Sequence, residues 1–209
     1  MRDDLIERLK ELYGCDEPIM AAEILSAWNE YSRPMVFRLL KRYTESGSLA
    51  RFDTGIYYIP TDTFLGKSKL DPQKVINKRF IESGGDVFGY YAGMGLFNGL
   101  GLTTQVPMTA EIVTEKETTR VRKVMVGKAK VLLRRAKTNI NKSNAPALQF
   151  LEAMKFIYEP LDEYQVENLR EFVRLNNVKE KDVLTYSNLF PKRAMENLRR
   201  IGAKNVFAQ

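Results

Sequence analysis

The stretch that decides the fold is Ser32-Arg33-Pro34-Met35-Val36-Phe37-Arg38-Leu39-Leu40-Lys41-Arg42-Tyr43, residues 32–43. Serine is a preferred N-cap and proline is favoured in a first helical turn, so we expect a helix that begins at Ser32. The apolar side chains that recur at helical spacing are Val36, Leu39, Leu40 and Tyr43. At about 100° per residue, the opposite face carries Arg38 and Lys41. The stretch therefore predicts an amphipathic helix with a cationic outer face.

Two further helices are predicted before this one, and two strands after it. Residues 3–13 have helical spacing and end at Gly14, and a second helix is predicted to begin near Pro18. Residues 49–52 and 56–59 have the composition of strands, and the turn Asp53-Thr54-Gly55 joins them. Three helices followed by a hairpin predict a winged helix-turn-helix domain in residues 1–60.

In a helix-turn-helix, the third helix lies in the DNA major groove and its N-terminal residues meet base edges. Arginine and lysine supply the contacts to guanine and to phosphate, and the free amides at a helix start can hold a phosphate. The residues that we expect to contact DNA are Ser32, Arg33, Arg38, Lys41 and Arg42 on the helix, with Arg51 and Thr54 on the hairpin. The same architecture also serves as a protein-docking module, and that alternative remains open.

Composition excludes several kinds of chemistry. The chain has 209 residues, with 33 Lys plus Arg against 26 Asp plus Glu, no histidine, and Cys15 as its one cysteine. Ser-His-Asp and Cys-His catalysis, histidine zinc sites and internal disulfides are therefore impossible. No acidic cluster has the spacing of a magnesium site, so we expect no enzyme, no metal and no cofactor.

The lack of long apolar runs and the single cysteine predict a cytoplasmic protein. No run approaches the roughly 18 apolar residues of a membrane helix, and the first residues lack the apolar core of a signal peptide. A single cysteine also suits a reducing compartment. We therefore expect no membrane partner, and the sequence does not specify an oligomeric state.

Residues 61–70 are predicted to be a linker, and residues 71–209 a mixed α/β C-terminal domain with a helical tail. Asp71-Pro72 should start a helix, and strands are expected at 110–114, 121–126 and 130–134. Residues 84–101 hold seven glycines without the spacing of a phosphate-binding loop. We expect a helix at 91–100 whose Gly95 and Gly99 permit close packing. From Asn144 onward the pattern is helical, so the fold class is α+β.

A second basic stretch accompanies the strands, since residues 121–160 hold nine basic and two acidic side chains. This surface is a candidate site for an acidic partner, either a protein or a nucleic acid. Charges on edge strands also prevent aggregation, which is the equally weighted alternative. The candidate partner-binding residues are Arg122, Lys123, Lys130, Arg134, Arg135 and Lys137.

Three segments resemble a known family. Gly89-Tyr90-Tyr91-Ala92-Gly93, Leu100-Gly101-Leu102-Thr103-Thr104-Gln105-Val106-Pro107 and Arg134-Arg135-Ala136-Lys137 are similar to a bacterial family related to the AbiEi antitoxins. Gly55-Ile56-Tyr57-Tyr58-Ile59-Pro60 resembles the wing that ends the antitoxin's N-terminal domain. The resemblance covers roughly residues 20–155.

The resemblance implies a type IV toxin–antitoxin setting. It implies a transcriptional regulator whose winged helix binds double-stranded DNA in its own promoter, and whose C-terminal domain supports neutralisation of a nucleotidyltransferase-like toxin. The positions that carry over as DNA contacts are Arg33, Arg38, Lys41, Arg42 and Arg51. A protein-interaction module and a nucleic-acid-processing enzyme are the alternatives, and the lack of an acidic site disfavours the enzyme.

Overall fold

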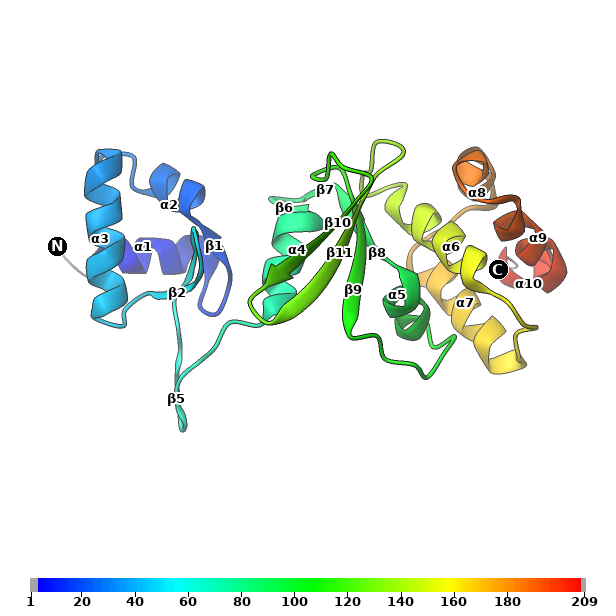
Figure 1. Ribbon diagram of the computed structural model, residues 1–209, viewed down its shortest axis with the longest axis horizontal. Helices are drawn as coiled ribbons and strands as arrows, with labels where there is room; N and C mark the ends of the chain where they lie inside the picture. Colours follow the sequence, from blue (N-terminus) through cyan, green and yellow to red (C-terminus); the bar gives the residue numbers. More distant parts are fainter. Residues whose placement is uncertain (1–3, 208–209) are drawn as a thin grey trace. The chain divides into compact units, whose positions relative to one another are not determined.

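The computed structural model describes residues 4–207, which form an α+β protein (Figure 1). Contacts divide the chain into two units. The first is Met1–Lys78 with Val126–Lys128, and the second is Arg79–Met125 with Ala129–Gln209. The α+β class predicted from the sequence is confirmed.

Three helices and a three-stranded sheet make up most of the first unit. In chain order they are α1 (Asp4–Tyr13), β1 (Ile19–Met20), α2 (Ala21–Ala27), α3 (Arg33–Glu45), β2 (Ala50–Asp53) and β3 (Ile56–Tyr58). The strand order is β1-β3-β2, and both pairings are antiparallel. The helices surround Trp28, which is fully buried and whose Nε1 donates a hydrogen bond to the Leu5 carbonyl at 3.3 Å.

The predicted start of the second helix was wrong. Residues 19–20 form a strand, and α2 begins only at Ala21. Ile19 pairs with Tyr57, and Met20 pairs with Ile56, so a partner far along the chain overrides the local helical spacing.

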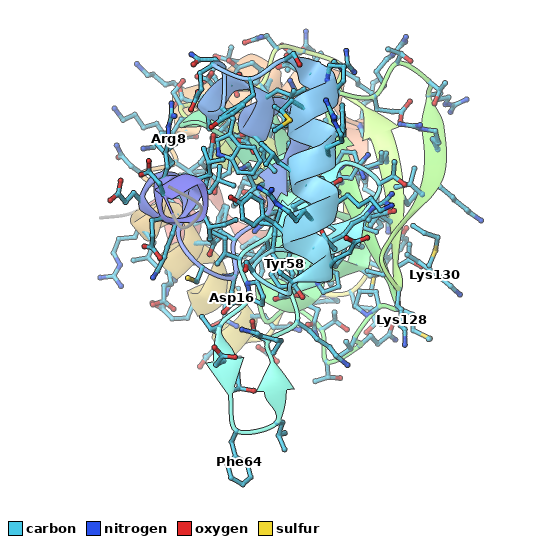
Figure 2. All side chains as sticks on the ribbon, turned by 90° about the vertical axis from the view of Figure 1, so that its left-hand side faces the viewer. Arg8, Asp16, Tyr58, Phe64, Lys128 and Lys130 are labelled. Atoms are coloured by element: carbon cyan, nitrogen blue, oxygen red, sulfur yellow. The ribbon has the colours of Figure 1, made fainter. Side chains whose placement is uncertain are left out.

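The segment 61–70, predicted as a linker, contains a short hairpin of β4 (Asp62–Thr63) and β5 (Gly66–Lys67). Phe64 at its tip is fully exposed, and Figure 2 shows its ring pointing away from the rest of this unit. The base of the hairpin is attached to Asp16, whose carboxylate accepts hydrogen bonds from Thr61 Oγ1 at 2.7 Å and from Ser68 Oγ. Burial raises the pKa of Asp16, but these hydrogen bonds outweigh it, and the net pKa is lowered.

Helix α4 (Pro72–Phe80) contributes two lysines to the first unit. Lys74 Nζ lies 2.5 Å from a Glu17 carboxylate oxygen, and Lys78 Nζ lies 2.8 Å from Glu23. The same two amines donate hydrogen bonds to the Asp16 and Pro18 carbonyls. By these contacts, the first unit extends through 61–70 into α4.

A four-stranded mixed sheet lies at the centre of the second unit, in the order β10-β11-β9-β8. The elements before and within it are β6 (Glu82–Ser83), β7 (Asp86–Val87), β8 (Gly89–Ala92), α5 (Gly93–Gly99), β9 (Thr109–Thr114), β10 (Val121–Val126) and β11 (Ala129–Arg135). β9 is antiparallel to β8 and parallel to β11. The three predicted strands are confirmed, but their order in space was not predicted.

The start of the helix expected at 91–100 was wrong, and so was the expectation that Gly95 and Gly99 permit close packing. Tyr91 pairs with Ile112 in the sheet, and α5 begins at Gly93. A methyl group on Gly95 would lie 3.6 Å from Pro107, and one on Gly99 would meet nothing within 4 Å. The close approach is at Gly89, where a methyl group would lie 2.0 Å from the Phe80 carbonyl oxygen.

The tail of the second unit is helical, as predicted. It comprises α6 (Ala145–Phe156), α7 (Glu163–Leu175), α8 (Glu180–Tyr186), a 3-10 turn at Ser187–Leu189, α9 (Lys192–Ile201) and α10 (Ala203–Phe207). α6 is apolar around most of its circumference and is largely buried. Buried Asn197 on α9 donates hydrogen bonds to the Met154 and Ile157 carbonyls at 2.7 and 2.8 Å, so it satisfies the C-terminal end of α6.

Candidate functional site

Helix α3 buries the apolar stripe that the sequence predicts. Val36, Leu39, Leu40 and Tyr43 are all buried in the core of the first unit. Ser32 is the N-cap residue with extended backbone angles, although its side chain makes no capping hydrogen bond. Pro34 lies in the first turn, and Gly47 follows the helix with a φ of +73°. The predicted helix is confirmed.

The opposite side of α3 is exposed, and we call it the α3 face. Its members are Ser32, Arg33, Phe37, Arg38, Lys41 and Arg42. At about 100° per residue, the helical members occupy roughly half of the circumference. The five residues that were predicted on this helix therefore share one exposed surface. Phe37 was not predicted; its position four residues after Arg33 was the signal that places it on the same side.

The cations of the α3 face are almost free of acidic partners. Lys41 Nζ lies 3.9 Å from Glu45, at the limit of an ion pair, and its side chain is 79% exposed. Arg33 lies over the Phe37 ring at 5.8 Å, and Arg42 lies over Tyr43 at 5.3 Å. Within residues 4–207, Arg38 forms no ion pair. These positive charges remain available to an external anion.

The β2–β3 hairpin holds the other two predicted residues, and both are exposed. Arg51 Nε donates to the Asp53 carbonyl at 3.2 Å, and Arg51 Nη2 donates to Thr54 Oγ1 at 3.1 Å. Asp53 in turn accepts the Thr54 amide proton at 2.6 Å. The guanidinium is therefore held along the turn, with an aspartate beside it that offsets part of its charge.

Five of the six predicted partner-binding residues are exposed, and Arg134 is partly buried. Arg122, Lys123 and Lys130 are exposed on β10 and β11. Arg122 is paired with buried Glu117 at 2.7 Å. Figure 2 shows Lys130 directed outward from β11. Arg134, Arg135 and Lys137 also line a cavity of about 380 Å³ between the sheet and the residues around 190.

The expectation that Arg134 is an exposed cation was wrong. Only 24% of its side chain is exposed, and its Nη2 is bonded to Glu152, a carboxylate that is 3% exposed. Lys155 Nζ is bonded to the same carboxylate. The pairing explains the burial, because a buried charge requires a partner of opposite sign. Glu152 and Lys155 lie on α6, and no pattern in the sequence associates them with Arg134.

Residues 4–207 contain no group of three or more acidic or cysteine side chains that could hold a metal ion. No helix in this part of the chain has the length and apolarity needed to span a membrane.

Comparisons with known proteins add one finding. No curated protein matches this sequence. Residues 24–183 match a family of unknown function, DUF6088, and the match covers most of the chain, from the second helix of the first unit to α8 of the second. The chain therefore belongs to the DUF6088 family.

Proposed function

We propose that the chain is a DNA-binding transcriptional regulator whose first unit acts as a winged helix-turn-helix. The observation that carries the proposal is the α3 face, where Arg33, Arg38, Lys41 and Arg42 are exposed and have, within residues 4–207, only one weak contact to an acid. An exposed helix with unpaired cations at its N-terminal half suits insertion into the major groove. In this proposal the β2–β3 hairpin is the wing, and Arg51 and Thr54 contact the backbone.

The α3 face offers two kinds of contact. Arg33 and Arg38 are long enough for bidentate hydrogen bonds to guanine, whereas Lys41 and Arg42 lie farther along the helix and pair with phosphates. Phe37 has an exposed ring among these cations. An apolar side chain at this position can contact the methyl group of thymine.

Acidic residues near the N-terminus do not oppose the proposal strongly. Glu17 and Glu23 are paired with Lys74 and Lys78 of α4. Glu30 is paired with Arg8 at 2.9 Å. These carboxylates are partly neutralised within the unit, so their repulsion of DNA is reduced.

The test is a fluorescence-anisotropy titration of the full chain with a duplex from the region upstream of its own gene. A scrambled duplex of equal length is the reference. We expect R38Q to weaken binding to the promoter duplex by about 1–3 kcal/mol and to reduce its preference over the scrambled one. K41Q should weaken binding to both duplexes and lower the slope against salt concentration by about 1.

K10Q is the matched control, because it removes one exposed cation from α1 of the same unit. It should leave both affinities within a factor of two. Equal binding by R38Q, K41Q and wild type would contradict the assignment of α3 to the groove.

The fuller form of the proposal is an AbiEi-like antitoxin that represses its own operon and neutralises a nucleotidyltransferase-like toxin. The resemblance of residues 89–93, 100–107 and 134–137 to AbiEi relatives supports it. If the neighbouring reading frame encodes such a toxin, its expression alone should arrest growth, and co-expression of this chain should restore growth. Growth arrest that this chain does not relieve would leave a regulator without the antitoxin role.

A protein-interaction module is the second candidate. The exposed aromatic rings of Tyr31 and Phe37, 38% and 42% exposed, favour it, because aromatic residues are enriched where proteins dock. The anisotropy experiment separates the two functions, since a docking module would show no salt-dependent affinity for either duplex.

A further inference from the structure

The lining of the cavity in the second unit contains both apolar and cationic side chains. The apolar part of its lining includes Val113, Leu148, Leu189 and Phe190. The remainder is rich in cations, which are Arg120, Arg134, Arg135, Lys137 and Lys155. Its volume of about 380 Å³ is within the range of small-molecule sites.

Two of the five cations share one carboxylate, which offsets a single positive charge. Arg134 and Lys155 both contact the Glu152 carboxylate, which is the single acidic side chain in the cavity lining. Burial lowers the pKa of Lys155, although Glu152 opposes that shift. Burial and the charge of Glu152 raise the pKa of Tyr90, which lines the same cavity, so its hydroxyl stays protonated and can donate a hydrogen bond.

The other three cations have no carboxylate partner within residues 4–207. Arg135 Nη1 donates to the Thr118 carbonyl at 3.4 Å, and Lys137 Nζ donates to the Leu189 carbonyl at 2.6 Å. Arg120 forms no ion pair in this part of the chain. Carbonyl oxygens hold the Arg135 and Lys137 side chains in place but leave their charge uncompensated.

One buried donor is also unsatisfied. Arg134 Nε is inaccessible to solvent and has no hydrogen-bond partner among the described residues. The Glu111 carboxylate lies 3.9 Å from this atom, beyond hydrogen-bond distance. Buried polar groups are nearly always hydrogen-bonded, so this donor is an exception. Because it is closed to solvent, a ligand in the cavity does not reach it.

We propose that the cavity binds a small organic anion that carries a carboxylate or phosphate beside a flat apolar group. The acid group pairs with Arg120, Arg135 and Lys137. The apolar group lies against Leu148, Leu189 and Phe190. This site is separate from the α3 face, so the proposal does not depend on DNA binding.

Isothermal titration calorimetry on the full chain tests both halves of this chemistry. The probes are adenosine 5′-monophosphate and benzoate, which join a phosphate or a carboxylate to a flat ring, with inorganic phosphate and adenosine as the separate parts. We expect at least one joined probe to bind tenfold or more tightly than either phosphate or adenosine. Whichever of the two joined probes binds more tightly identifies the acid group, phosphate or carboxylate, that the site prefers.

Two variants assign binding to the cavity. R135Q and K137Q remove charges that have only carbonyl partners, so both should fold, and each should weaken the joined probe tenfold or more. K123Q removes an exposed cation of β10 that does not line the cavity, and it should bind like wild type. Thermal melts of all three variants establish that they are folded.

The proposal is overturned if neither joined probe binds more tightly than phosphate or adenosine. It is also overturned if folded R135Q and K137Q bind the joined probe as well as K123Q does. Neither outcome bears on promoter binding, which is measured with another ligand and other variants.

Discussion

Gly89, on β8, has no room for a side chain. A Cβ there would lie 2.0 Å from the Phe80 carbonyl oxygen and 2.9 Å from that of Val113, and both are backbone atoms that cannot rotate away. We expect G89A to lower the free energy of unfolding by about 1–3 kcal/mol, measured by urea denaturation.

G95A is the control for this prediction. Gly95 lies in α5, where a methyl group would be in ordinary contact with Pro107 at 3.6 Å. Alanine also favours a helix over glycine, so G95A should be neutral or slightly stabilising. Equal losses in G89A and G95A would contradict the close approach assigned to Gly89 and would favour the packing role that the sequence suggested for Gly95.

Individual residues were predictable where burial alone decides their place. The spacing of Val36, Leu39 and Leu40 indicates which side of the helix is buried, and hence that Arg38 and Lys41 are exposed. Arg134 was not predictable, because its environment depends on Glu152, which lies 18 residues later on a different element. A strand pattern gives the face on which a cation lies, and it does not reveal a carboxylate brought from a helix.

At the scale of elements, pairing between distant segments explains what the sequence missed. β1 has two residues and acquires its conformation from β3, about 37 residues away. β9 lies between β8 and β11. The alternation of apolar and polar residues along each strand does not indicate that β9 pairs with β11 in parallel. The helices were more predictable, because caps and apolar spacing are local signals.

The turn between β9 and β10 depends on one carboxylate. Glu117 accepts hydrogen bonds from the Thr119 amide and hydroxyl at 2.9 and 2.7 Å, and from Arg122 Nε at 2.7 Å. The bonds from Thr119, aided by Arg122, lower the pKa of Glu117 from 4.5 to about 2. A lowered pKa means that the ionised form stabilises the fold above the unfolded pKa, and that this stability is lost as pH falls from about 4.5 toward 2.

E117Q should therefore melt several degrees below wild type at neutral pH, because a charged acceptor with three bonds is replaced by an amide. The difference in Tm should narrow steadily as pH falls below about 4.5. E159Q is the control, since Glu159 is exposed and its side chain has no bond within the described residues. A gap between E117Q and wild type that stays constant down to about pH 3 would refute the assigned pKa.

At the scale of the whole molecule, each of the two proposed sites belongs to a different unit. The α3 face lies in the first unit, and the anion cavity lies in the second. The basic residues at 31–60 and at 121–160 looked alike in the sequence, but they are organised differently. The first group is exposed, with four members on α3 and Arg51 on β2, whereas Arg134 of the second group is paired with buried Glu152.

The extent of the first unit gives the last prediction. Residues 1–60 contain all three helices and the β2–β3 hairpin, yet Asp16, Glu17 and Glu23 have their partners at Thr61, Lys74 and Lys78. A fragment of residues 1–80 retains these contacts and the whole of α4, whereas a fragment of residues 1–60 loses them.

Thermal melts followed by circular dichroism should show a higher Tm for residues 1–80 than for residues 1–60. The variant K74Q/K78Q, made in the longer fragment, should lower its Tm part of the way toward that of residues 1–60, because it removes the two ion pairs and leaves α4 in place. If the two fragments melt together, the contacts from 61–78 do not stabilise the unit, and residue 60 is its physical end. If the longer fragment is more stable but both bind DNA equally, the added segment supports the fold and the α3 face acts alone.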